Sequence, residues 1–214
     1  MNNETKTLIS IGAITLAILV GVIYAVSVFS NKPVETKQID PSLLVRSNSN
    51  IRPAKNATIT LVEFTDLQCP ACGAAYPVVK QIVEDHKNDV TFVVRNFPLI
   101  NIHKNAFPAA LAAEAAGAQG KYWEMYDKLY ETQNAWSENK DVRAVFIAYA
   151  QELQLNEEQF TKDFDEQKFK DKINKDVADG NAVGVNATPT FFINGVKFEG
   201  SYIQLPAAIE ELLQ

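Results

Sequence analysis

The two cysteines of the chain lie three positions apart, in the segment Cys69-Pro70-Ala71-Cys72. Two thiols one helical turn apart can form and break a disulfide between themselves. The segment follows an apolar, β-branched run over residues 58–64 and opens a helical pattern, so Cys69 stands at the start of a predicted helix. Free N–H groups and the helix dipole lower the pKa of a cysteine there. The pattern therefore predicts a redox-active pair in which Cys69 is the attacking thiol.

Two other uses of the cysteine pair stay open from the residues alone, and each fits the pattern less well. A structural disulfide across one turn closes a very small loop, so it would restrict the unfolded chain little. A zinc site would need two more ligands, and the histidines, His86 and His103, lack the spacing of a zinc finger. We therefore expect no metal site and no soluble cofactor.

The elements on either side of the cysteines alternate between strand and helix. Residues 58–64 and 90–94 have the composition of buried strands, and a helix over about 69–87 lies between them, kinked at Pro77. A strand, helix, strand order predicts a right-handed crossover into a parallel pair.

A long helical insert is predicted from about residue 103 to 183. Residues 190–199 then form a hairpin around Asn194-Gly195, a typical type I′ turn, and a helix over 205–213 closes the chain. This order predicts an α/β fold with two sheet-forming halves. Aromatic residues of the insert recur at helical spacing and are expected to pack in the core: Tyr122, Trp123, Tyr126 and Tyr130.

Glu63 interrupts the apolar strand six residues before Cys69. Burying a carboxylate is costly unless it is partnered or neutralised. From the residues alone, Glu63 is either a hydrogen-bonded structural acid or an acid with a raised pKa near the thiols.

The N-terminal 56 residues differ from the rest of the chain. Residues 7–31 contain 25 positions without a charge, enough for a helix to cross the hydrocarbon core of a bilayer. We expect residues 1–31 to be a cytoplasmic N-terminus and a transmembrane anchor, residues 32–56 a flexible stalk, and residues 57–214 the folded domain. A cleaved secretory signal is the alternative, although its apolar region would be shorter.

The basic residues beside the span and the chemistry of the cysteine pair predict opposite orientations for this anchor. Lys32, Lys37 and Arg46 follow the span and only Lys6 precedes it, so the positive-inside count favours a cytoplasmic domain. Long C-terminal domains translocate with little regard to charge, and disulfides persist mainly outside the cytosol. We therefore expect a single-pass cell-membrane protein whose catalytic domain is extracytoplasmic.

The overall composition excludes one class of partner. The 214 residues are 47% apolar, and 20 basic against 26 acidic residues give a net charge of −6. Nucleic-acid binding needs clustered Lys and Arg, so we expect no nucleic-acid partner.

Several segments resemble one family in the same order along the chain. Residues 62–72 (VEFTDLQCPAC) resemble the active-site strand and loop of the DsbA-like thioredoxin-fold disulfide oxidoreductases. Residues 97–99 (FPL), His103, residues 114–136 and residues 187–195 (ATPTFFING) resemble further landmarks. The resemblance implies a thioredoxin fold with a helical insertion over the domain that follows the stalk. With the N-terminal anchor, it suggests a membrane-tethered member.

The resemblance also implies roles for individual residues. Pro189 corresponds to the family's cis-proline, beside the active-site sulfurs, and Thr188 would offer its backbone to an extended substrate peptide. Glu63 would move protons to and from the buried thiol of Cys72. His103 is either a packed, capping residue or one that influences the thiols.

The sequence departs from the strongly oxidising members between the cysteines. Those members have Pro-His at the two central positions, where this chain has Pro70-Ala71. Ala71 cannot donate a hydrogen bond to a thiolate, which predicts a milder oxidant.

We therefore expect an enzyme that introduces disulfides into cysteine-containing exported proteins through Cys69 and Cys72. A membrane disulfide-generating partner would reoxidise it. A reductase or isomerase on the same fold is one alternative. A tethered peptide-binding or chaperone-like module, in which the cysteines form a structural clip, is the other.

Overall fold

A computed structural model describes residues 17–24 and 39–214 of the chain. The chain divides into two units, residues 1–37 and residues 38–214. In the first unit, residues 17–24 form a short helix. No helix within the described ranges is both long and apolar enough to cross a membrane. Most of the predicted span over 7–31, and the start of the predicted stalk, lie outside the described residues.

The second unit is built on a five-stranded mixed sheet in the order β1-β3-β2-β4-β5. The central strand β2 runs parallel to β3 and antiparallel to β4, and β1 and β5 add antiparallel edges. The parallel pair is the crossover that the sequence predicted. The strands are β1 (Asn50–Arg52), β2 (Ile59–Thr65), β3 (Val90–Asn96), β4 (Thr190–Ile193) and β5 (Val196–Lys197).

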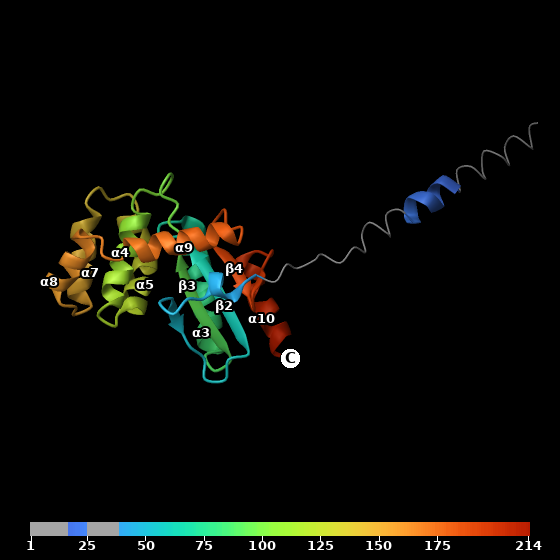
Figure 1. The fold of residues 1–214 in the computed structure, drawn as a ribbon, viewed down its shortest axis with the longest axis horizontal. Coiled ribbons are helices and arrows are strands. Elements are labelled where there is room, and N and C mark those ends of the chain that lie inside the picture. The colour runs from blue at the N-terminus through green and yellow to red at the C-terminus, as the bar shows by residue number, and fades with distance from the viewer. Residues whose placement is uncertain (1–16, 25–38) are drawn as a thin grey trace, which may run out of the picture. The chain divides into compact units, whose positions relative to one another are not determined.

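The two faces of the sheet bury different side chains because alternate residues of a strand point to opposite faces. Leu61 of β2 faces a large core formed with α3, α4, α5 and α10, whereas Val62 faces a smaller one formed with α2 and α9. Figure 1 shows α9 lying across the sheet. The helices named here are α2 (Pro41–Leu44), α3 (Pro70–Asp85), α4 (Ala106–Gly117), α5 (Tyr122–Glu131), α9 (Lys170–Ala182) and α10 (Leu205–Leu213).

The helical insert separates β3 from β4. Besides α4, α5 and α9 it contains α6 (Gln133–Trp136), α7 (Val142–Glu152) and α8 (Glu157–Asp165). The small alanine side chains of α4 allow it to pack closely against α5, α7 and α8. Trp136 of α6 is fully buried in the insert. The insert therefore shares the core that covers one face of the sheet.

The structure differs from the predicted stalk over residues 39–56. Strand β1 pairs with β3, Leu44 is buried, and Arg46 forms an ion pair with Asp179 of α9. The segment lacks an apolar period because its polar side chains bind distant partners: Asn50, for example, donates to Glu114 across 2.8 Å. The folded unit thus begins well before residue 57.

The hairpin predicted around Asn194-Gly195 is confirmed. The φ angles of Asn194 and Gly195 are 49° and 85°, as a type I′ turn requires at both central positions. This turn pairs β5 with β4 and so directs the chain back toward the loop that precedes β4.

Candidate active site

The cysteines lie where β2 ends and α3 begins. Cys69 is the N-cap residue of α3, and Pro70 occupies the first helical turn, where its missing N–H costs nothing. Cys72, one turn further on, is fully buried. Both are free thiols, so the structure is that of the reduced form. Cys69 is 7% exposed, so it keeps a small accessible surface that Cys72 lacks.

The two thiols differ strongly in acidity. The Cys72 thiol donates a hydrogen bond to the Cys69 sulfur and, with the backbone N–H groups of Cys72 and Ala71, lowers the pKa of Cys69 to about 5 against the opposing effect of burial. Burial, together with this same interaction, raises the pKa of Cys72 well above its usual value. Cys69 is therefore a thiolate at neutral pH while Cys72 keeps its proton.

The loop before β4 closes over Cys69. The peptide bond between Thr188 and Pro189 is cis, and the carbonyl oxygen of Thr188 lies 3.4 Å from the Cys69 sulfur. Within the described part of the chain, the buried Thr188 hydroxyl has no hydrogen-bond partner. Beside this loop, residues 189–191 and 197–202 line a surface groove of about 260 Å³.

Glu63 lies in the centre of the sheet, on the face that carries the cysteines. Its side chain is 1% exposed, and the Tyr126 hydroxyl donates a hydrogen bond to Glu63 Oε2 across 3.2 Å. Burial raises the pKa of Glu63 to about 7, although hydrogen bonds from Thr65 and Tyr126 oppose the shift. The negative charge of Glu63 also contributes to the raised pKa of Cys72. The carboxyl group is thus poised to gain or lose a proton near neutral pH.

His103 holds the loop in front of the active site. Its Nδ1 atom lies 2.7 Å from Asp66 Oδ2, and the same carboxylate accepts from the backbone N–H groups of Gln68 and Leu99, each at 2.8 Å. Asp66 therefore ties His103 and the segment after β3 to the residues that lead into Cys69. This geometry favours the packed, loop-holding alternative for His103.

The aromatic residues of α5 are core residues, as their spacing predicted. Tyr122, Tyr126 and Tyr130 are buried and pack on Trp123 and Tyr76 of α3.

Gln133 is a site residue that the sequence reasoning missed. Its side-chain amide donates to the carbonyls of Leu67 and Cys69 across 2.8 Å and 3.0 Å. A side chain on Gly73 would meet this amide, with its Cβ 2.4 Å from the Gln133 Oε1 atom. Through these two hydrogen bonds the insert holds the active-site turn in place. A single glutamine in a helical segment does not indicate such a contact in the sequence.

Comparisons with known proteins agree with this geometry. Residues 49–211 match the family model described as Thioredoxin. The chain is 27% identical to a thioredoxin-like oxidoreductase from Silicibacter pomeroyi, with a TM-score of 0.67 over 80% of this chain and 96% of that one.

Two further solved structures share the fold. They are oxidised BdbD of Bacillus subtilis (22% identity, TM-score 0.70, 83% and 97% coverage) and α-DsbA1 of Wolbachia pipientis (24% identity, TM-score 0.69, 80% and 94% coverage).

The chain also matches part of much longer proteins. It is 38% identical over 154 residues to the Na⁺/H⁺ antiporter NhaA 1 of Salinispora arenicola, but this is 72% of the chain and only 22% of the antiporter. In NhaA 1 of Mycolicibacterium vanbaalenii the match is 33% over 175 residues and 27% of the length. Because the chain spans about a quarter of these relatives, their transport activity does not transfer to it. From the family match over residues 49–211, the chain belongs to the thioredoxin family, and it shares the fold of the DsbA-like structures described above.

Proposed function

We propose that the protein oxidises cysteine pairs in exported proteins by donating the disulfide between Cys69 and Cys72. The observation that carries the proposal is the asymmetry of the pair. Cys69 has a lowered pKa and lies under the Thr188 carbonyl, whereas Cys72 is fully buried with a raised pKa. When the reduced form of a cysteine pair contains a stabilised thiolate, the disulfide of that pair is more easily reduced. Such a disulfide therefore tends to oxidise the thiols of a substrate.

The reaction proceeds by two thiolate attacks. A substrate thiolate attacks the sulfur of Cys69, the disulfide to Cys72 breaks, and Cys72 leaves as a thiolate that takes a proton from Glu63. The second substrate thiolate then attacks the substrate sulfur of the mixed disulfide and releases Cys69 as a thiolate. The substrate loses two electrons and gains a disulfide, and the enzyme ends with both cysteines reduced.

Substrate binding is assigned to the loop around Thr188 and Pro189. Pro189 lines the adjoining groove, and the carbonyl oxygen of Thr188, the residue before it, lies 3.4 Å from the Cys69 sulfur. An extended peptide that binds through its main chain can be recognised with little sequence preference, which suits an enzyme with many substrates.

The N-terminal segment is assigned as a membrane anchor that holds the catalytic domain outside the cytoplasm. The uncharged run over residues 7–31 supports this, and so does thiol chemistry that requires an oxidising compartment. A membrane disulfide-generating protein would then reoxidise Cys69 and Cys72. Protease added to intact spheroplasts should digest the domain, whereas digestion only after lysis would contradict this topology.

The direction of electron flow is tested by the redox state of the cysteines in cells. Rapid acid quenching, followed by alkylation with a mass-tagged reagent, counts free thiols on Cys69 and Cys72. An oxidase should be found mostly as the disulfide. A protein held mostly as the dithiol would instead be a reductase or isomerase.

Replacing Glu63 by glutamine should slow the steps in which Cys72 exchanges a proton. A coloured aromatic disulfide reports this directly, because the reduced enzyme releases one coloured thiolate when Cys69 attacks and a second when Cys72 resolves the mixed disulfide. We expect Glu63→Gln to leave the first phase unchanged and to slow the second at least about tenfold at pH 7, since general-base assistance is lost. The deficit should shrink at high pH, where Cys72 ionises unaided.

The matched control is Glu131→Gln, which alters an exposed carboxylate at the end of α5. Equal pH profiles of the second phase for Glu63→Gln and the wild type would contradict the proton-transfer role of Glu63.

A further inference from the structure

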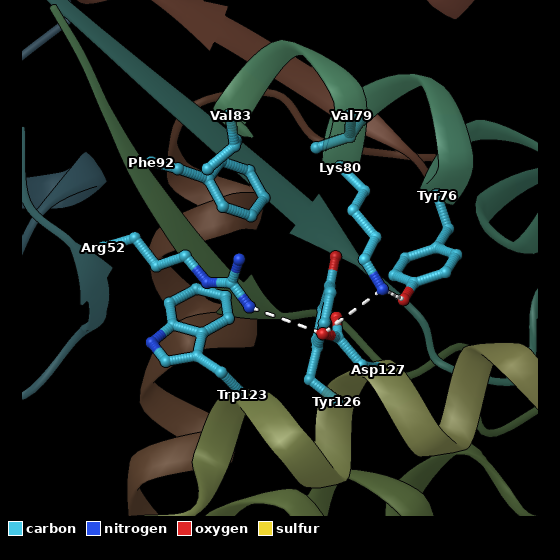
Figure 2. A pocket seen from close by; sticks show the side chains of 9 residues that line it. All are labelled: Arg52, Tyr76, Val79, Lys80, Val83, Phe92, Trp123, Tyr126 and Asp127. Atoms are coloured by element: carbon cyan, nitrogen blue, oxygen red, sulfur yellow. Dashed lines mark hydrogen bonds and ion pairs between the residues drawn. The ribbon is translucent and has the colours of Figure 1, made fainter. Parts of the chain in front are cut away.

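The Tyr126 hydroxyl of helix α5 contacts Glu63, the buried acid of the sheet. Tyr126 is 3% exposed, and its hydroxyl hydrogen-bonds Glu63, which lies 63 positions earlier in the chain. Figure 2 shows the Tyr126 side chain rising from α5, in the same pocket wall as Trp123 and Tyr76. The hydrogen bond therefore joins the insert to the strand that precedes the cysteines.

The Tyr126 ring is fixed by its neighbours. Its centroid lies 4.9 Å from that of Tyr130 and 5.6 Å from that of Trp123, both in edge-to-face contact, and 6.0 Å from that of Tyr76. Rings packed on several sides do not change rotamer without displacing one another. The hydroxyl is thus held in one position relative to Glu63 before any reaction starts.

The rings of Tyr76, Trp123 and Tyr126 also line a small pocket. The pocket has about 10 Å³ of room for the centre of a water molecule, roughly one water site, and Tyr126 forms part of its wall. Arg52 and Lys80 each form an ion pair with Asp127 at its rim. Removing only the hydroxyl of Tyr126 would leave this wall in place, because phenylalanine keeps the ring.

Glu63 accepts hydrogen bonds from Thr65 on the same strand and from Tyr126 on α5. Its negative charge in turn raises the pKa of Cys72 on α3 and of Tyr122 and Tyr130 on α5. None of these side chains is a cation, so the carboxylate form of Glu63 depends on neutral hydroxyl donors. Hydrogen bonds to the charged form of an acid favour that form, and the bond from Tyr126 acts in this direction.

We propose that Tyr126 is a positioning residue for proton transfer at Cys72, because its hydroxyl holds the Glu63 carboxylate in place and stabilises it. The inference rests on the proposed role of Glu63. It gives the helical insert a part in the chemistry, since α5 supplies a second hydroxyl donor beside that of Thr65 on the sheet. Among the described residues, the hydroxyl of Tyr126 hydrogen-bonds Glu63 and neither cysteine sulfur.

The test compares Tyr126→Phe with Tyr122→Phe in the full chain. Tyr122 is a matched control because it is a buried tyrosine of the same helix whose hydroxyl has no hydrogen-bond partner among the described residues. In the coloured-disulfide assay, Tyr126→Phe should leave the attack of Cys69 unchanged. The pH midpoint of the second phase should rise by roughly one unit, which is about a tenfold lower rate at a fixed pH below the midpoint. Tyr122→Phe should overlay the wild type.

Two further measurements separate positioning from a general loss of packing. The Glu63 carboxyl titration, followed by carbon NMR, should move upward in Tyr126→Phe and not in Tyr122→Phe. In a Glu63→Gln background, Tyr126→Phe should slow the second phase no further. Matching profiles and titrations for the two tyrosine variants would overturn the inference. Failure of the wild type to release either thiolate would instead contradict the proposed function on which it rests.

Discussion

Replacing Cys72 by serine should make the protein accumulate stable mixed disulfides, whereas replacing Cys69 should abolish them. The Cys69 thiolate attacks a disulfide and forms a bond to one partner sulfur, and only an internal thiol can then resolve that bond quickly. Serine is the preferred replacement because its hydroxyl can still donate to Cys69, as the Cys72 thiol does in the structure. The complex should therefore form at a nearly normal rate and persist.

The measurement uses a purified disulfide-containing peptide, acid quenching, alkylation and non-reducing electrophoresis. At pH 7 the complex should be at least about tenfold more abundant for Cys72→Ser than for Cys69→Ser, because the thiolate fraction of the remaining cysteine sets the rate of attack. The double serine variant gives the background. More complex from Cys69→Ser than from Cys72→Ser would reverse the assigned order of the two thiols.

Replacing Arg95 by methionine should destabilise the folded unit more than any substitution at the surface. Arg95 is fully buried on the sheet face opposite the cysteines. Its guanidinium donates to Asp176 and Asp179, each at 2.7 Å, and to the carbonyls of Leu43 and Leu44. Removing one partner of a buried ion pair leaves uncompensated charges, which costs about 3–5 kcal/mol.

Urea denaturation at pH 7 measures this loss. Arg143→Met is the matched control, because Arg143 pairs with Asp165 through two similar hydrogen bonds at an exposed site, where ion pairs stabilise little. Equal unfolding free energies for the two variants would contradict the assigned importance of the Arg95 cluster.

The pH dependence of this loss has a definite sign. Burial would raise the pKa of Asp179, but hydrogen bonds from Arg46 and Arg95 outweigh it and lower that pKa to about 2. A lowered pKa contributes stability that is present above the unfolded value of about 4 and is lost as the pH falls toward 2. The gap between the wild type and Arg95→Met should therefore be widest near neutral pH and narrow in acid.

The parts of the fold that were predictable depend on local pattern. A short β-branched run before a helical pattern predicts strand β2, helix α3 and the cysteines between them. The pair Asn194-Gly195 predicts the β4–β5 hairpin. The position of Glu63 was visible because one carboxylate interrupts an apolar strand. In each case neighbouring residues carry the information.

The parts that were not predictable depend on contacts between distant residues. Arg46 was assigned to a stalk because its neighbours are polar, yet its partner Asp179 lies 133 positions away. Tyr126 was expected in the core, but nothing in its surroundings indicates that its hydroxyl meets Glu63. Cys69 likewise lies 3.4 Å from the carbonyl oxygen of Thr188, 119 positions later. Polar pairs of this kind have no periodicity, so only the folded chain reveals them.

The most direct test of the central claim is disulfide transfer from the full chain to a peptide with two cysteines. The protein is first oxidised, and mass spectrometry locates its disulfide and then follows both molecules after mixing. The account predicts a disulfide between Cys69 and Cys72 that moves to the peptide, so that the peptide loses two hydrogens as the protein gains two. A protein whose Cys69–Cys72 disulfide stays intact while the peptide remains reduced would contradict it.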